Sequence, residues 1–270
     1  MMQGRVLIVA GSDSGGGAGI QADIKAVTCL QGFAMTAITA LTAQNTCGVH
    51  GVHPIPLDFI RQQIQVVVQD IGADCIKTGM LGDAPTIETV ALALEEFAPD
   101  VPLVVDPVMV AKGGHPLLAQ EAVTALKGRL IRRAALITPN LPEAESLVGR
   151  PIRTLADMEA AADDLLALGA RAVLLKGGHL AAEERLMDLL ITPDGVTRFE
   201  SGRVATTSTH GTGCTLASAI AAGLAQGRDL TQAVARGRDY VLGAIRTAPG
   251  FGKGHGPLDH AHTVRPFDRL

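Results

Sequence analysis

The sequence predicts an α/β protein built in three layers, with helices on both sides of a mostly parallel sheet. Short apolar segments that suit strands alternate with amphipathic segments that suit helices along the whole chain. The 270 residues include 31 glycines and are 47% hydrophobic but only 3% aromatic, and small side chains allow helices to pack closely on a sheet. The sequence shows no composition break, so we expect residues 1–270 to form one domain.

The strands are predicted from short apolar or β-branched runs that stop at polar or turn residues. The first run, Arg5–Ala10, is bounded by glycine and is typical of a buried strand. The other expected strands are Ala34–Ala43, Cys75–Thr78, Leu103–Val105, Ala134–Thr138, Ala172–Lys176, Leu186–Ile191 and Val196–Glu200. The last two flank the turn sequence TPDG, which indicates a hairpin.

The helices are predicted where apolar residues recur every three or four positions. They are expected at Ile20–Leu30, Leu57–Ile71, Thr86–Phe97, Leu117–Leu126, Leu155–Leu168, Thr212–Ala225 and Leu230–Ile245. Because single helices separate the strands, right-handed crossovers and parallel pairing are expected. The charge-free segment between Lys25 and Asp58 is interpreted as strands plus a buried, polar-lined loop, and the tail from Pro249 onward is expected to be irregular.

Charge and cysteine content argue against several classes of protein. The net charge is −4 with 23 basic residues and no basic stripe, so nucleic acid is not an expected partner. The first residues reach Gly, Ser and Asp too early for a signal peptide, and the longest charge-free stretch is too polar for a membrane helix. We expect a cytoplasmic protein with reduced thiols, because no CxxC spacing occurs among Cys29, Cys47, Cys75 and Cys214.

The strongest chemical motif is THGTGC at residues 209–214, which leads into a predicted helix. Gly211 and Gly213 let the backbone approach a ligand, and the free N–H groups of the helix start point toward it. These dipoles favour an anion such as a phosphoryl group in transfer. Cys214 would project beside this hole, where the helix terminus would lower the thiol pKa and let it take a proton from a substrate hydroxyl. The alternative is a glycine turn that caps a packed helix, with Cys214 in the core.

A second glycine-rich segment, GSDSGGGAGIQAD at residues 11–23, follows the first predicted strand. The Rossmann pattern fits it only loosely, from Gly17, and no acidic partner stands between Lys25 and Asp58. The Walker pattern also fails, because the Gly252-Lys253 pair lacks the required Gly before it and Ser or Thr after it. We therefore expect a loop that approaches a small substrate closely, with a plain strand-to-helix connection as the alternative.

Polar residues recur where predicted strands end: Gln44, Asn45, Asp106, Asn140, Glu143 and Lys176. In open parallel sheets, ligands bind beyond the carboxyl ends of the strands. Asp106 and Glu143 are hard oxygen ligands that could hold Mg²⁺ directly or through water, and Lys176 could neutralise nucleotide phosphate. Such residues also cap strands and turns, but their recurrence favours a site. The histidines match no metal motif and are expected on the surface or in loops.

Seven segments together identify a family. They are AGSDSGGGAGIQADIK, ITALTAQNTCGV, KTGMLGD, DPVMVAKGG, ITPNLPEAE, LLKGGH and THGTGCTLASAIAAGLA, from residue 10 to beyond residue 220. With them the chain resembles the hydroxymethylpyrimidine/phosphomethylpyrimidine kinases of thiamin biosynthesis, in the ribokinase-like superfamily. The resemblance implies a three-layer ribokinase-like fold, ATP with Mg²⁺, and phosphorylation of 4-amino-5-hydroxymethyl-2-methylpyrimidine and then of its monophosphate. By analogy with the superfamily, we expect a homodimer.

The resemblance also implies roles for individual residues. Gln44 is similar to the carboxamide that pairs with the aminopyrimidine edge, to which it offers a donor and an acceptor. The other implied roles are pocket walls for Asp23, Gly11, Met80 and Val108, anion hole and base for Gly211, Thr212, Gly213 and Cys214, metal-side acids for Asp106 and Glu143, and nucleotide contacts for Asn140 and Lys176.

Two positions depart from related patterns. Sugar kinases of the superfamily have Asp where Cys214 stands, and a thiol with an ordinary pKa of about 8.5 needs tuning to act as a base. The family usually has Pro-Ser where this chain has Ser14-Gly15. The segments around Gly15–Gly17 and Ala111–His115 contain glycine and are expected to close over the substrate.

Three other functions compete with the pyrimidine kinase. A pyridoxal or pyridoxine kinase is the nearest, because its substrate also carries a hydroxymethyl group on a nitrogen heterocycle. The pair Gln44-Asn45 fits an aminopyrimidine better without excluding the other ring. A non-catalytic binding protein is disfavoured because the hole and both acids are present, and a dinucleotide oxidoreductase is disfavoured by its incomplete fingerprint.

Overall fold

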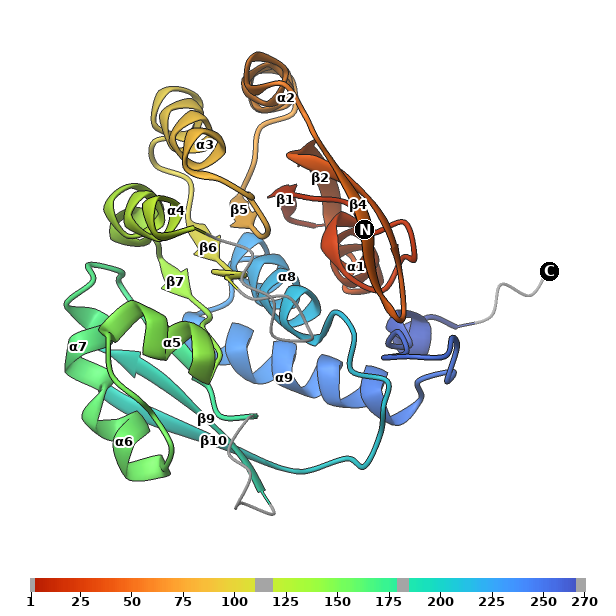
Figure 1. Cartoon of the computed structure of the whole chain (residues 1–270), viewed down its shortest axis with the longest axis vertical. Coiled ribbons are helices and arrows are strands. Elements are labelled where there is room, and N and C mark those ends of the chain that lie inside the picture. The colour runs from red at the N-terminus through yellow and green to blue at the C-terminus, as the bar shows by residue number, and fades with distance from the viewer. Residues whose placement is uncertain (1–2, 110–118, 179–184, 266–270) are drawn as a thin grey trace.

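An eight-stranded sheet forms the centre of the computed structural model, which describes residues 3–109, 119–178 and 185–265 (Figure 1). The strand order is β10-β9-β8-β7-β6-β5-β1-β2. Six neighbouring strands are parallel: β1 (Arg5–Ala10), β2 (Phe33–Ile38), β5 (Cys75–Thr78), β6 (Leu103–Val105), β7 (Leu136–Ile137) and β8 (Val173–Lys176). The hairpin of β9 (Arg185–Thr192) and β10 (Gly195–Gly202) adds an antiparallel edge. The predicted mostly parallel sheet is confirmed.

Helices cover both faces of this sheet, which gives the three expected layers (Figure 1). One face carries α2 (Leu57–Asp70), α3 (Ala84–Phe97), α4 (Gln120–Ala125), α5 (Leu141–Val148), α6 (Leu155–Ala160) and α7 (Ala162–Leu166). The other face carries α1 (Gly19–Cys29), α8 (Thr212–Ala225) and α9 (Leu230–Arg246). Short helical turns complete the set: η1 (Leu126–Leu130), η2 (Ile131–Arg133) and η3 (His260–Thr263).

The alternation of side chains along β1 separates the two hydrophobic cores. Leu7 and Val9 pack into the core under α2 and α3, whereas Val6 and Ile8 pack into the core under α1 and α8. Small residues allow the second helical layer to pack tightly, since a Cβ added at Gly223 of α8 would lie 2.9 Å from the Ala233 Cβ of α9. The abundance of Gly and Ala therefore has the structural use that the composition predicted.

The segment between Lys25 and Asp58 differs from the prediction. The single expected strand Ala34–Ala43 divides at Thr39, where the Thr39 N–H donates to the Ala10 carbonyl and its hydroxyl donates to the Met80 carbonyl. Beyond this point the chain leaves the large sheet, and β3 (Ala40–Asn45) pairs with β4 (Gly48–Pro54) in a separate antiparallel hairpin. Most of β4 is exposed, so the interpretation as a buried loop is wrong, because β-propensity does not specify which partner a strand pairs with.

Some element boundaries and burial expectations also need correction. The predicted helix Leu155–Leu168 divides at Ala161 into α6 and α7. The tail after Pro249 contains η3, and His260 there is buried and hydrogen-bonded to the Thr215 hydroxyl at 2.9 Å. Residues 111–115, which we expected to form a closing loop, lie outside the described residues. Within the described part of the chain, none of the helices has both the length and the apolarity needed to span a bilayer.

Candidate active site

The start of α8 makes a close contact with the N-terminal glycine loop. Gly211, the N-cap residue of α8, has φ +80°, in the left-handed region that favours glycine. A Cβ added there would lie 1.8 Å from the Gly17 carbonyl oxygen. Glycine is therefore required both by the backbone conformation and by the approach of the other loop. Two glycine-rich motifs that lie about 200 residues apart in the sequence meet here.

The first turn of α8 faces a lysine and an acid from the end of the parallel sheet. A Cβ added at Gly213 would lie 3.4 Å from the Lys176 Nζ and 3.6 Å from the Asp106 Oδ2. Asp106 directly follows β6, and Lys176 is the last residue of β8. Because both strands are parallel, their carboxyl ends lie at one edge of the sheet. The structure thus brings together three residues that the sequence placed in one site.

Asp106 and Lys176 form a hydrogen-bonded ion pair at this edge. The Lys176 Nζ lies 3.3 Å from the Asp106 Oδ1, to which the Thr138 hydroxyl also donates at 3.2 Å. Burial lowers the pKa of Lys176, but the nearby carboxyl groups of Asp106 and Glu143 outweigh it, so the pKa lies above its ordinary value. Lys176 therefore stays positively charged at neutral pH, as a phosphate contact requires.

Asn140 and Glu143 lie at the same edge and also form the N-terminal cap of α5. The Asn140 side chain accepts a hydrogen bond from the Glu143 N–H at 3.0 Å, and the Glu143 Oε2 accepts one from the Asn140 N–H at 2.8 Å. This reciprocal capping box stabilises the helix start. Burial raises the pKa of Glu143, and Lys176 acts in the opposite direction. The two predicted ligands thus hold each other in place, with Glu143 next to the ion pair.

The acidic residues at this edge suit a hard divalent cation that is shared with phosphate. Among the described residues, no cluster of three or more His, Cys, Asp or Glu side chains could hold a metal ion alone. Asp106 accepts its hydrogen bonds at Oδ1, whereas Oδ2 faces Gly213 and accepts none from the described residues. Mg²⁺ usually binds through one or two carboxylates together with substrate phosphates and water. Asp106, with the buried Glu143 close enough to influence the same groups, therefore fits Mg²⁺ that arrives with a nucleotide.

The thiol of Cys214 does not have the lowered pKa that its helix position predicted. Burial raises the pKa of Cys214 to about 12, and the opposing effect of Lys77 is smaller. Cys214 is therefore a neutral thiol at neutral pH. The lowering of the thiol pKa expected from the helix start is therefore not found, because burial has the larger effect.

Asp23 lies beneath the site and does not form its surface. Its carboxylate accepts hydrogen bonds from the Lys77 Nζ at 3.0 and 2.9 Å and from the Ser218 hydroxyl at 2.7 Å. The side chains of Asp23 and Lys77 are both 0% exposed. Burial is the largest single effect and lowers the pKa of Lys77, but the attraction of Asp23 and other nearby acidic groups together outweighs it, so the ammonium keeps its charge. The expected wall residue is thus part of a buried ion pair that supports α1, β5 and α8 from below.

The other residues predicted to bind the pyrimidine lie around the end of β1. Gly11 donates its N–H to the Met80 carbonyl at 3.2 Å, and an added Cβ there would lie 2.4 Å from the Met80 Cε. Gln44 is on β3, where the Ser14 hydroxyl donates to its carbonyl and accepts from its N–H. Val108, two residues after Asp106, has φ +38°, a strained conformation for a β-branched residue. Such strain is typical of functional sites.

Sequence reasoning missed two residues that connect these parts, Asp13 and His210. Asp13 is buried, with 1% of the residue exposed. Its carboxylate accepts hydrogen bonds from the N–H groups of Gly15, Gly17 and Ala18. The His210 Nε2 lies 2.8 Å from its Oδ2. The sequence predicts no metal site at the histidines and places His210 only at the surface or in a loop. Its position within THGTGC was the available signal.

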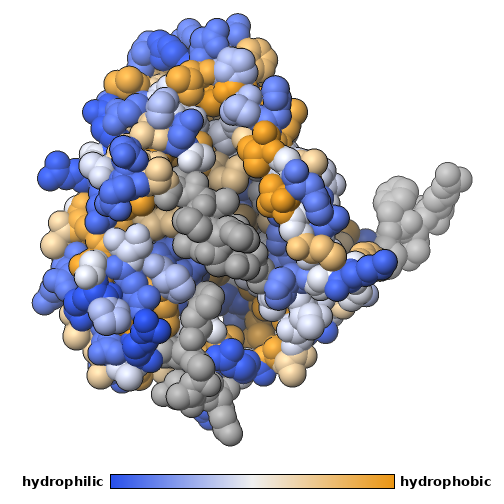
Figure 2. Space-filling model, viewed as in Figure 1, coloured by the Kyte–Doolittle hydropathy of each residue, from blue (hydrophilic) through white to orange (hydrophobic). Residues whose placement is uncertain are grey.

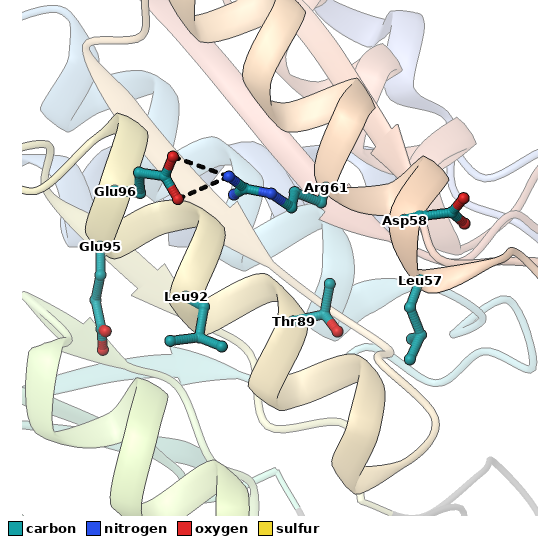
Figure 3. A pocket seen from close by; sticks show the side chains of 7 residues that line it. All are labelled: Leu57, Asp58, Arg61, Thr89, Leu92, Glu95 and Glu96. Carbon is teal, nitrogen blue, oxygen red and sulfur yellow. Dashed lines mark hydrogen bonds and ion pairs between the residues drawn. The ribbon is translucent and has the colours of Figure 1, made fainter.

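A surface hollow lies away from this edge of the sheet. It has a volume of about 630 Å³, lies between α2 and α3, and is lined by exposed side chains that include Leu57 and Leu92 (Figure 3). In Figure 3, Arg61 and Glu96 point toward one another across it. It contains none of the predicted site residues, so we assign the chemistry to the sheet edge at α8.

The fold and this edge together define a phosphotransferase. A parallel sheet, a helix start whose N–H groups are free to meet an anion, a charged lysine and a carboxylate with an unused oxygen are parts that phosphoryl transfer can use. Residues 13–259 match the sequence pattern of the phosphomethylpyrimidine kinase family. The chain belongs to this family, and the expected ribokinase-like fold is confirmed.

Named relatives agree with this assignment. The hydroxymethylpyrimidine/phosphomethylpyrimidine kinase of Bacillus subtilis is 48% identical over 256 residues, which are 95% of this chain and 94% of that protein. A thiamine biosynthesis bifunctional protein of Geobacter sulfurreducens is 53% identical over 96% of this chain, but the match spans only 52% of that longer protein.

The chain is similar to solved structures of two kinds of kinase. A Bacillus subtilis pyridoxal kinase in complex with ADP has a TM-score of 0.89 and 37% identity, over 96% of this chain and 98% of that one. A phosphomethylpyrimidine kinase of Clostridium difficile has a TM-score of 0.80 and 40% identity, over 89% of this chain and 99% of that one.

Proposed function

We propose that this protein transfers the γ-phosphoryl group of ATP to 4-amino-5-hydroxymethyl-2-methylpyrimidine and then phosphorylates the resulting monophosphate to the diphosphate. The observation that carries the proposal is the convergence of Gly213, Asp106 and Lys176 at the carboxyl edge of the sheet. The pyrimidine as substrate rests on family membership and on relatives that are 46–53% identical over nearly the whole chain.

Transfer is proposed to occur in line, with most of the catalysis from positioning and electrostatics. The backbone amides from Gly211 to Cys214, including that of Thr212, stabilise the moving phosphoryl group at the helix start. Lys176 contributes a fixed positive charge and Asn140 a further contact with the nucleotide. Asp106 and Glu143 would hold Mg²⁺, which neutralises phosphate charge when bound.

Cys214 is proposed to lie against the acceptor hydroxyl. Because its pKa is raised to about 12, the thiol is protonated at neutral pH and is a poor base in the free protein. A loose phosphoryl-transfer transition state places little demand on a base. We therefore assign most of the rate enhancement to the anion hole and Lys176.

The acceptor is proposed to lie between the glycine loop and the hairpin of β3 and β4. Gln44 would pair with the aminopyrimidine edge, and Gly11, Met80 and Val108 would surround the ring. Asp23 supports this pocket through its buried pair with Lys77 and does not itself touch the ring.

Pyridoxal kinase activity is the second candidate, because several structural neighbours are pyridoxal kinases, including one from Staphylococcus aureus solved with pyridoxal. The deciding experiment is ATP consumption by purified protein with Mg²⁺ and either the pyrimidine, its monophosphate or pyridoxal. We expect turnover of both pyrimidines to exceed that of pyridoxal. Efficient turnover of pyridoxal alone would contradict the pyrimidine assignment while leaving the anion hole in place.

The remaining proposals concern the whole protein. We propose that residues 1–270 act as one domain, in the cytoplasm, as a homodimer. Support for the dimer comes from exposed apolar side chains on the hairpin of β3 and β4, namely Leu41, Val49 and Val52. Apolar residues also emerge among polar ones on the face shown in Figure 2. Light scattering that gives a monomer mass across micromolar concentrations would contradict the dimer.

A further inference from the structure

The side chain of His210 connects the anion-hole turn to the residue that we assign to the pyrimidine. Its Nε2 lies 2.8 Å from the Asp13 Oδ2 and 3.4 Å from the Gln44 Nε2. The ring packs against the glycine loop, because a Cβ added at Gly17 would lie 2.5 Å from the His210 Cδ2. His210 therefore contacts both the carboxylate that organises this loop and the end of the Gln44 carboxamide.

The Asp13 carboxylate determines the protonation of the nitrogen that faces it. Burial alone would raise the pKa of Asp13, but hydrogen bonds from His210, Ala18 and Gly15 outweigh it, so the pKa lies below its ordinary value and Asp13 is ionised. An unprotonated Nε2 would place its lone pair against this anion. The Nε2 of His210 therefore carries a proton and donates it to Asp13.

This proton decides which end of the Gln44 carboxamide suits the contact. A nitrogen that donates cannot also accept from an amide N–H, so the compatible neighbour is the carboxamide oxygen. At the other end of the carboxamide, the Thr42 hydroxyl lies 3.2 Å from the Gln44 Oε1 and 2.8 Å from the Ser12 carbonyl. We assign its single proton to the nearer acceptor, Ser12. The lone pair of the Thr42 hydroxyl then suits an amide N–H. Both neighbours therefore favour the same orientation of the carboxamide, with its oxygen toward His210 and its NH₂ group toward Thr42. This orientation is reached from the one in the structure by a half-turn that exchanges the two ends of the carboxamide.

The backbone of Gln44 is held independently of this contact. The Ser14 hydroxyl bonds to both its N–H and its carbonyl, and the nearby tip of the hairpin is tied to the tail by the His255 N–H, which donates to the Thr46 carbonyl. The anion-hole turn is likewise held by the backbone, since the His210 N–H donates to Gly256. Loss of the imidazole would thus leave both loops in place and free mainly the carboxamide.

We propose that His210, fixed by Asp13, is a positioning residue that sets the orientation of the Gln44 carboxamide and so the order of donor and acceptor presented to the pyrimidine. An aminopyrimidine edge offers a donor next to a ring acceptor, and the corresponding 4-oxo pyrimidine in its N–H form offers the reverse order. A fixed carboxamide accepts one order and leaves unpaired groups with the other. This inference rests on the proposed role of Gln44.

The test compares kcat/KM for the 4-amino substrate and its 4-oxo analogue in the wild-type protein, His210→Ala and His210→Gln. We expect His210→Ala to reduce the amino-over-oxo preference about tenfold through KM for the pyrimidine, with KM for ATP unchanged. His210→Gln can still donate to Asp13 and should recover part of the preference. Arg153→Ala, at a position that is 77% exposed between α5 and α6 and away from this hairpin, is the control and should behave as wild type.

Three results would overturn the proposal. An unchanged preference in a folded His210→Ala protein, with its unfolding midpoint measured in parallel, would show that His210 does not orient the carboxamide. A loss confined to kcat would assign His210 to the anion hole instead. The variant Gln44→Ala distinguishes the role of Gln44 in binding the pyrimidine from the role of His210 in orienting Gln44. If Gln44→Ala leaves the preference intact, the role of Gln44 itself fails, whereas a loss there without a loss in His210→Ala overturns only the role of His210.

Discussion

Two lysine–carboxylate pairs lie near the first turns of α8, and they differ in depth. Lys77 and Asp23 are both 0% exposed, and the ammonium contacts both carboxylate oxygens at 3.0 and 2.9 Å. Lys176 and Asp106 are 14% and 4% exposed and share one contact of 3.3 Å. The chemical groups are the same, but the first pair is closed to ligands and the second faces Gly213.

This difference separates a structural role from a chemical one. The fully buried pair also accepts a hydrogen bond from Ser218, so it has no hydrogen-bonding capacity left for a substrate. Its role is to hold α1, β5 and α8 together. A pair with one long contact and one unused carboxylate oxygen can exchange its partner for phosphate or metal with little rearrangement. Depth, and not residue type, distinguishes the two.

The largest expected effect is on stability and follows from Lys77→Met. Removing the ammonium leaves Asp23 buried without a counter-charge, which typically costs about 3–5 kcal/mol of unfolding free energy. Urea unfolding of the purified variant measures this loss. The double variant Lys77→Met/Asp23→Leu removes both charges and should recover part of the stability. If Lys77→Met unfolds at the same urea concentration as wild type, the comparison between the pairs is wrong.

The next effect is on activity and follows from Gly213→Leu. The added side chain begins 3.4 Å from the Lys176 Nζ and would fill the space for the phosphoryl group. We expect kcat to fall at least about 100-fold, the typical loss when an oxyanion contact is removed. Gly128→Ala is the matched control, because a Cβ added at that glycine meets nothing within 4 Å. Near-normal turnover in folded Gly213→Leu would remove the anion hole from the mechanism.

A smaller effect is expected for Cys214→Ala. Because burial raises the thiol pKa to about 12, Cys214 is neutral at every pH below that value, and no thiolate ionisation should appear in the rate between pH 6 and 9. We expect kcat to fall by less than the roughly 100-fold that a general base supplies. Iodoacetamide labelling followed by mass spectrometry should modify the exposed Cys47 before Cys214. Rapid labelling of Cys214 at neutral pH would contradict the neutral thiol.

The smallest effect is expected for an exposed pair that serves as a baseline. Arg185 and Glu200 are 75% and 46% exposed on the hairpin of β9 and β10. Solvent screens such pairs, so Arg185→Ala should change the unfolding free energy by less than about 1 kcal/mol. Thermal unfolding of this variant sets the scale for the buried pairs, and a loss as large as that of Lys77→Met would show that depth is not the deciding factor.

The sequence allowed the strands of the parallel sheet and the position of Asp106, Lys176 and Gly213 to be predicted, because strand ends in a parallel sheet share one edge. The break at Thr39 could not be predicted, because its hydrogen bonds go to Ala10 and Met80, which are distant in sequence. The different roles of Asp23 and Asp106 could not be predicted from residue type, because burial depends on what packs above each carboxylate.

The central claim is that Lys176 contacts the phosphate of the substrate, whereas Lys77 stabilises the fold. The variant Lys176→Met tests this claim most directly. The measurement is kcat with the hydroxymethylpyrimidine at saturating ATP, together with the unfolding free energy of the same preparation. The account predicts a fall in kcat of at least about 100-fold, with less than half of the stability loss seen in Lys77→Met. Retained turnover, or a loss of stability equal to that of Lys77→Met, would contradict it.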